Sequence, residues 1–93
     1  MSSEACRYLI ENYRGRLRGL AVDFLSLASP LDTVDGGEAH RFLCSNYYQE
    51  NIFIVEDAHM TELDALRLKS AVVIPLFMAG VDSSPVTAWV EVE

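Results

Sequence analysis

Basic residues are scarce in this sequence. Seven Lys and Arg stand against fourteen Asp and Glu, which gives a net charge of 7 − 14 = −7. Phosphate binding needs a clustered basic face, and the sequence offers only the alternating arginines Arg14, Arg16 and Arg18. We assign these three to a solvated edge that leads into a strand, and we expect no nucleic-acid partner.

Cysteine and long apolar runs are also scarce. Cys6 and Cys44 are too few for a disulfide scaffold, and residues 1–4 lack the basic and apolar regions of a signal peptide. We therefore expect a reducing, cytoplasmic setting. The longest apolar stretch, residues 71–81, contains a proline and a glycine and is shorter than the roughly 20 residues of a membrane-spanning helix. We expect no membrane span.

The composition is that of a chain that folds, with 51% apolar and 23% charged residues. A length of 93 residues allows one core at most. Domains of this size bury only about 60–65% of their unfolded surface, so their stability is marginal. A bound metal ion or a partner chain would add stability.

Apolar spacing predicts two helices. In the first, apolar residues recur at i, i+3, i+4 and i+7, namely Cys6, Leu9, Ile10 and Tyr13. Ser2 or Ser3 can cap its start, and Gly15 can end it. The second is a short helix from about Glu38, which follows a loop over residues 30–37 that contains two adjacent glycines.

Four short apolar segments predict strands. Leu20–Leu25 and Ile52–Val55 are apolar runs, as in buried strands. The run Ala71–Phe77 predicts a third strand, which Pro75 places at an edge or at an irregular end. Residues 86–92 alternate apolar and polar side chains, which predicts a strand with one buried face. A single helical turn is expected over 61–66. The order of elements favours an α/β fold, with helices packed on a mixed sheet and no linker that separates two domains.

Asp23 is the first candidate functional residue, because it interrupts an apolar run. A buried carboxylate needs a hydrogen-bond donor or a cation, or its pKa rises. One interpretation is that Asp23 takes part in a functional site. The other is that it bonds nearby backbone amides and Ser26. The sequence leaves both open.

His40, Glu56, Asp57 and His59 form a candidate metal cluster around the second predicted strand. Imidazole and carboxylate ligands suit zinc or manganese. A structural interpretation is equally simple: a hydrogen-bonded histidine on a half-buried helix, and acidic residues at a solvated corner. His40 and Cys44 are also four residues apart, on one helical face, but they lack two further ligands.

Several segments, taken in order, resemble one protein family. They are Ser3–Glu11, Gly19–Leu27 with its Asp-x-x-Ser pattern, His40–Leu43 with its His-x-x-Leu pattern, Asn51–Glu56 followed by Leu63–Leu66, and Ile74–Leu76 with Gly80–Val86. Together they cover nearly the whole chain. The chain resembles the carboxyl-terminal part of the cyclase-like metal-dependent hydrolases, the family of bacterial-type kynurenine formamidase (arylformamidase) and isatin hydrolase.

The resemblance implies a fold, a cofactor and a reaction. The fold is a swivelling β/β/α domain, usually dimeric, of which residues 1–93 would be the carboxyl-terminal portion. The cofactor is a zinc or manganese ion, and two of the family's ligands match His40 and Glu56. Asp23 and Ser26 would support the strand that carries the Asp-x-x-Ser pattern. The reaction is hydrolysis of a small aromatic formamide, such as N-formylkynurenine to kynurenine and formate in tryptophan catabolism.

The chain also departs from the family pattern. The main metal motif, His-x-Gly-Thr-His-x-Asp-x-Pro, and the general-base histidine lie in the amino-terminal half and have no counterpart here. The interval from His40 to Glu56 is longer than usual, with the extra residues in 45–51, and Phe77 and Thr87 replace Lys and Arg. We expect a chain that is inactive alone and that pairs with itself or with a complementary amino-terminal chain. The alternative is a non-catalytic remnant that acts as an interaction or dimerisation module.

Overall fold

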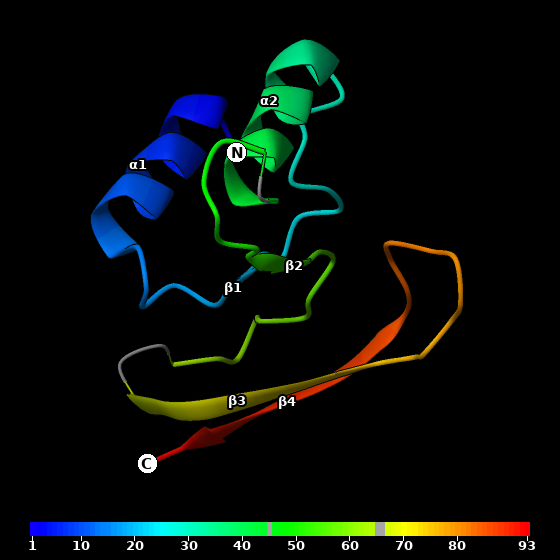
Figure 1. Cartoon of the computed structure of the whole chain (residues 1–93). Coiled ribbons are helices and arrows are strands. Elements are labelled where there is room, and N and C mark those ends of the chain that lie inside the picture. The colour runs from blue at the N-terminus through cyan, green and yellow to red at the C-terminus, as the bar shows by residue number, and fades with distance from the viewer. Residues whose placement is uncertain (45, 65–66) are drawn as a thin grey trace. The chain divides into compact units, whose positions relative to one another are not determined.

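The computed structural model describes residues 1–44, 46–64 and 67–93. These residues divide into two compact units, Met1–His59 and Met60–Glu93. Among the described residues the buried core cluster lies in the first unit, in agreement with the single core that the length suggested. Figure 1 shows the helices and the short parallel strands of the first unit, and the long hairpin of the second.

Helix α1 (Ser3–Tyr13) begins and ends as predicted. The Ser2 side chain caps it by accepting a hydrogen bond from the amide of Ala5, at 3.2 Å. Gly15 follows the helix with a φ of +76°, a left-handed conformation that favours glycine. The apolar side of the helix faces the core, where Cys6 and Ile10 are fully buried.

Helix α2 (Thr33–Leu43) is longer than the sequence predicted. It begins after Asp32, whose side chain accepts a hydrogen bond from the amide of Asp35 at 2.9 Å. The prediction of a loop over 30–37 was therefore wrong for most of its length. Gly36 is not a turn residue, because it lies against Ala28 so closely that a Cβ at position 36 would be 2.4 Å from the Ala28 Cβ.

The core of the first unit lies where α1 and α2 pack on each other, and Leu20 of the first strand segment and Ile54 of the second pack against it. Its buried members come from both helices, from the segment after β1 and from the segment before β2; they are Cys6, Ile10, Leu27, Ala39, Leu43 and Ile52. Burial of these side chains is the main favourable contribution to the stability of the unit.

Strands β1 (Gly19–Ala21) and β2 (Phe53–Val55) pair in parallel, with Leu20 opposite Ile54. The predicted strand Leu20–Leu25 was thus too long. After Ala21 the chain bends, and Leu25 is 79% exposed. Asp23 lies in this bend and is exposed, so its carboxylate is solvated and not buried as the apolar run suggested.

The second unit is an antiparallel hairpin of β3 (Leu68–Pro75) and β4 (Val86–Val92), with Val72 opposite Trp89. Both strands lie close to their predicted positions. The prediction of one buried face for residues 86–92 was wrong, because all seven are exposed. A two-stranded hairpin has no second layer of its own to cover a face.

The mixture of helices and strands agrees with the predicted α/β class. Parallel and antiparallel pairing both occur, but in two separate two-stranded sheets of the described residues rather than in one mixed sheet. The predicted turn over 61–66 reaches residues 65–66, which lie outside the described part of the chain. Within that part, each helix is too short or too polar to cross a bilayer.

Candidate functional site

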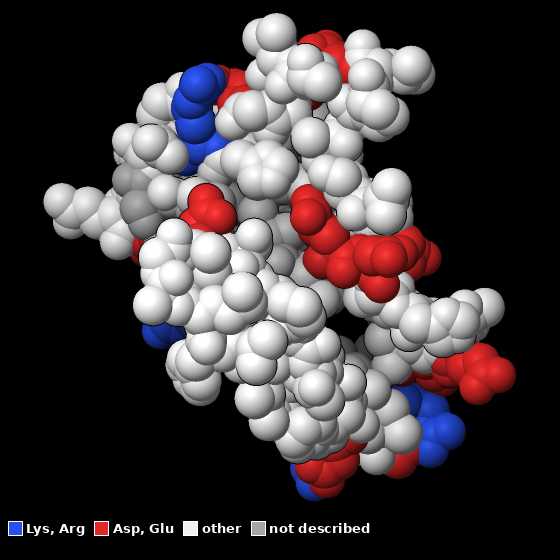
Figure 2. All heavy atoms as spheres, turned by 90° about the vertical axis from the view of Figure 1, so that its right-hand side faces the viewer, with Lys and Arg blue, Asp and Glu red and all other residues white. Residues whose placement is uncertain are grey.

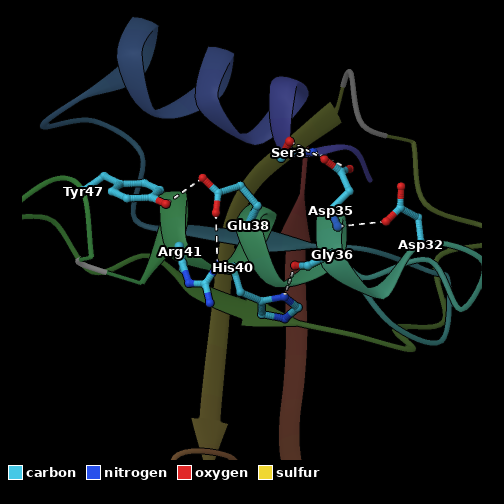
Figure 3. Close-up of polar contacts among 8 residues, drawn as sticks. All are labelled: Ser3, Asp32, Asp35, Gly36, Glu38, His40, Arg41 and Tyr47. Atoms are coloured by element: carbon cyan, nitrogen blue, oxygen red, sulfur yellow. Dashed lines mark hydrogen bonds and ion pairs between the residues drawn. The ribbon is translucent and has the colours of Figure 1, made fainter.

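His40 lies on α2, and its ring is held by the helix itself. Its Nδ1 is 2.8 Å from the carbonyl oxygen of Gly36, one turn earlier (Figure 3). A carbonyl oxygen can only accept, so Nδ1 carries the proton of the neutral ring and donates it in this hydrogen bond. The lone pair of the neutral imidazole is then on Nε2, the atom that can bind a metal ion.

Glu56 follows β2 directly, and its carboxylate is held by the bend after β1. Oε1 accepts hydrogen bonds from the Leu27 amide at 2.6 Å and from the Ser26 hydroxyl at 3.4 Å. The parallel pairing of β1 with β2 brings this bend next to Glu56. Ser26 therefore has a definite role here, as a donor that orients the carboxylate.

The side chains of His40 and Glu56, the two residues selected by the resemblance, lie near each other in the structure. His40 Nε2 is 3.9 Å from Glu56 Oε1, and the two side chains are 40% and 36% exposed. Bond lengths of about 2.0–2.2 Å put two ligands of one tetrahedral zinc ion about 3.3 Å apart. The observed separation is longer than this spacing. Both side chains are accessible to solvent.

The rest of the four-residue cluster does not join this pair. In residues 1–44, 46–64 and 67–93 there is no group of three or more His, Cys, Asp and Glu side chains placed to hold one ion. Asp57 has a φ of +55° and donates its amide to the Phe24 carbonyl at 3.0 Å, so the chain turns immediately after Glu56. Periodicity and spacing could not reveal this turn, because a left-handed aspartate has no sequence signature of its own.

Cys44 is exposed, and among the described residues it forms no three-ligand group with His40 and Glu56. Its amide donates to the His40 carbonyl at 2.8 Å, which ends helix α2. The spacing of four residues that suggested a His40–Cys44 ligand pair thus marks the last turn of a helix.

The sequence did not predict the network of polar contacts that lies along α2 (Figure 3). Asp35 accepts hydrogen bonds from both the hydroxyl and the amide of Ser3, and this lowers the pKa of Asp35. The contact ties α1 to α2, so it depends on packing and has no signal in local spacing.

The second part of this network lies near the end of α2. Glu38 accepts from the Tyr47 hydroxyl at 2.6 Å and from Arg41 at 3.2 Å. The hydrogen bond from Tyr47 lowers the pKa of Glu38, and the same bond raises the pKa of Tyr47. Only the Glu38–Arg41 contact had a sequence signal, the i, i+3 spacing of opposite charges on a helix.

The chain carries an excess of negative charge. Figure 2 shows a group of acidic side chains on the face that it draws, with other acidic and basic side chains scattered over that face. With a net charge of −7, the surface potential attracts divalent cations and repels phosphates.

No protein-family model, curated protein or solved structure matches this chain. Two observations bear on the function of this chain. One is the order of the sequence segments that resemble the cyclase-like hydrolases. The other is the distance between His40 and Glu56.

Proposed function

We propose that this chain provides two metal ligands, His40 and Glu56, to an amide hydrolase of the cyclase and arylformamidase type. The substrate would be a small aromatic formamide, in a cytoplasmic enzyme with the swivelling β/β/α fold. The observation that supports this best is the approach of Nε2 to Oε1 at 3.9 Å, between residues that are far apart in the sequence.

The donor set suits the proposed ion. A neutral imidazole nitrogen and a carboxylate oxygen are ligands that both zinc and manganese accept in proteins. When bound, such an ion lowers the pKa of a water ligand and polarises a carbonyl group. The Gly36 carbonyl keeps the His40 ring in the tautomer that leaves Nε2 available, and the Leu27 amide holds Glu56 in place.

The proposed site is incomplete in this chain. Structural zinc sites have four protein ligands and catalytic sites have three, whereas the described residues bring only two together. The other ligands would come from a complementary amino-terminal chain that carries the histidine-rich motif. The isolated chain should therefore bind a metal ion weakly and hydrolyse no formamide at a measurable rate.

Metal binding can be tested by equilibrium dialysis against zinc and manganese. Glu56→Gln keeps an oxygen that accepts from Leu27, and His40→Asn keeps an N–H donor near the Gly36 carbonyl, so both variants retain the local fold. We expect each to abolish the weak binding. His59→Asn, at the only other histidine, is the matched control and should bind like the wild type. Unchanged binding by both site variants would contradict the proposal.

Hydrolysis is tested with N-formylkynurenine, with the chain alone and with a separately purified chain that contains the missing motif. We expect turnover only in the mixture with metal, and its loss with Glu56→Gln. Turnover by the isolated chain would contradict the proposed incompleteness. A metal-loaded mixture that is inactive would contradict the hydrolase proposal.

A second candidate function, a non-catalytic interaction module, is favoured by the hairpin. Its apolar side chains are exposed on both faces: Val72 and Trp89, at 39% and 52%, share one face, and Val90, at 43%, lies on the other. Exposed apolar surface of this kind marks interaction sites, and a two-stranded hairpin is barely stable by itself. Inactive oligomers without bound metal would favour this candidate.

A further inference from the structure

The two outer edges of the β3–β4 hairpin differ in how they are protected. The outer edge of β3 has a lysine, Lys69, a proline, Pro75, and a bulge between Leu68 and Ser70. Each of these features blocks pairing with a further strand. Strand β4 has seven residues in regular register without a proline, a lysine or a bulge, and among the described residues it pairs only with β3. The unprotected edge is that of β4.

The register shows which backbone groups point to this edge. The Leu76 amide donates to the Pro85 carbonyl at 3.0 Å, so these two residues form a hydrogen-bonded pair. Hydrogen-bonded and non-hydrogen-bonded pairs alternate along an antiparallel ladder. Pro75, which has no N–H, then occupies a non-hydrogen-bonded position, where no hydrogen bond to β4 is lost. Four residues of β4 direct their N–H and C=O groups away from β3: Val86, Ala88, Val90 and Val92.

We propose that this edge pairs antiparallel with β4 of a second copy of the chain, about a two-fold axis at Trp89. This inference deepens the interaction-module candidate and does not depend on metal binding. An axis at Trp89 places Val90 opposite Ala88 of the second copy, and Val86 opposite Val92. All seven residues of the strand overlap, and every outward N–H and C=O group finds a partner.

The charges along β4 fit a second copy. Each chain carries a net charge of −7, so self-association requires an interface that keeps carboxylates apart. In this register Glu91 lies opposite Thr87 of the second copy, and Glu93 lies opposite Pro85. Acidic side chains therefore do not face each other across the axis.

The pairing would also compensate for the low stability of an isolated two-stranded hairpin. A sheet of three or more strands is needed for independent stability, and two paired hairpins give four. The interface consists mainly of backbone hydrogen bonds over seven residues, which places it among small interfaces. We expect a dimer in concentration-dependent equilibrium with the monomer.

Substitutions at Thr87 test the register in both directions. Thr87→Glu creates two like-charge pairs with Glu91 per dimer, and Thr87→Lys creates two opposite-charge pairs at the same positions. Cross-strand pairs of this kind should change the dissociation constant of the dimer by about 2- to 30-fold. Thr87→Glu should raise it, and Thr87→Lys should lower it. Sedimentation of the full chain over a range of concentrations measures both shifts.

A second variant tests the edge itself. Val90→Pro removes an outward N–H and leaves the hydrogen bonds between β3 and β4 in place, so the monomer should fold and the dimer should be lost. Val90→Ala keeps the N–H and is the control. Trp89, the only tryptophan, would face its own copy at the axis, and exciton coupling in the circular dichroism spectrum should grow with the dimer fraction.

The outcomes are distinguishable. If the wild-type chain sediments as a monomer at all concentrations, it does not self-associate, and the inference is wrong. If the two Thr87 variants and Val90→Pro dimerise as strongly as the wild type, the proposed edge is wrong. The chain would then still be an interaction module, but it would dimerise through another surface. Opposite shifts for the two Thr87 variants support the register, and metal dialysis reports separately on His40 and Glu56.

Discussion

The two adjacent glycines of α2 should respond in opposite ways to the same substitution. Gly36 and Gly37 both lie inside the helix, where alanine is more favourable than glycine by about 1 kcal/mol. A Cβ at Gly37 would meet nothing within 4 Å. Gly37→Ala should therefore stabilise the protein by about 1 kcal/mol.

Gly36→Ala should destabilise the protein. The new Cβ would be 2.4 Å from the Cβ of Ala28 and 2.9 Å from its Cα. These atoms belong to the main chain or are attached directly to it, so the clash can be removed only by a shift of the backbone. The loss of stability should therefore lie near the upper end of the range for overpacked cores, about 3 kcal/mol. After the helical gain of about 1 kcal/mol, the net loss is about 2 kcal/mol. The two variants should then differ by about 3 kcal/mol.

Far-ultraviolet circular dichroism during urea and thermal unfolding measures this difference, because both helices lie in the Met1–His59 unit. The melting temperature should rise by about 4–8 °C for Gly37→Ala and fall by about 8–16 °C for Gly36→Ala. Equal stabilisation by both variants would refute the packing of Gly36 against Ala28. No gain for Gly37→Ala would refute the early start of α2 and favour the start near Glu38.

Two further predictions concern ionisation. Hydrogen bonds from Ser3 lower the pKa of Asp35 from 3.8, so its contribution to stability is present above the unfolded value and is lost as the pH falls through the lower folded value. Asp35→Asn should remove this pH-dependent part of the free energy of unfolding, measured by urea unfolding at a series of acidic pH values. The same pH dependence in the variant and the wild type would contradict the Ser3–Asp35 contact. The hydrogen bond to Glu38 raises the pKa of Tyr47 above 10.0. Glu38→Gln should lower it again in phenolate absorbance titrations corrected with Tyr47→Phe, whereas no change would contradict the Tyr47–Glu38 contact.

The sequence located one element of the candidate site. The family resemblance selected His40 and Glu56, and the apolar run before Glu56 located strand β2. The hydrogen bonds that orient the two side chains were not predictable. They involve the Gly36 carbonyl, inside a segment expected to be a loop, and the Leu27 amide, beyond the true end of β1. Both depend on backbone positions that packing decides.

The sequence by itself determined the first helix, the positions of the strands and the excess of negative charge. Each of these follows from local spacing, capping residues or composition. Tertiary structure alone decided that Gly36 continues a helix, that Asp23 faces solvent and that Nε2 of His40 meets Oε1 of Glu56. The physical reason is that these outcomes depend on main-chain contacts between segments far apart in the chain, and such contacts form only when the strands pair and the helices pack.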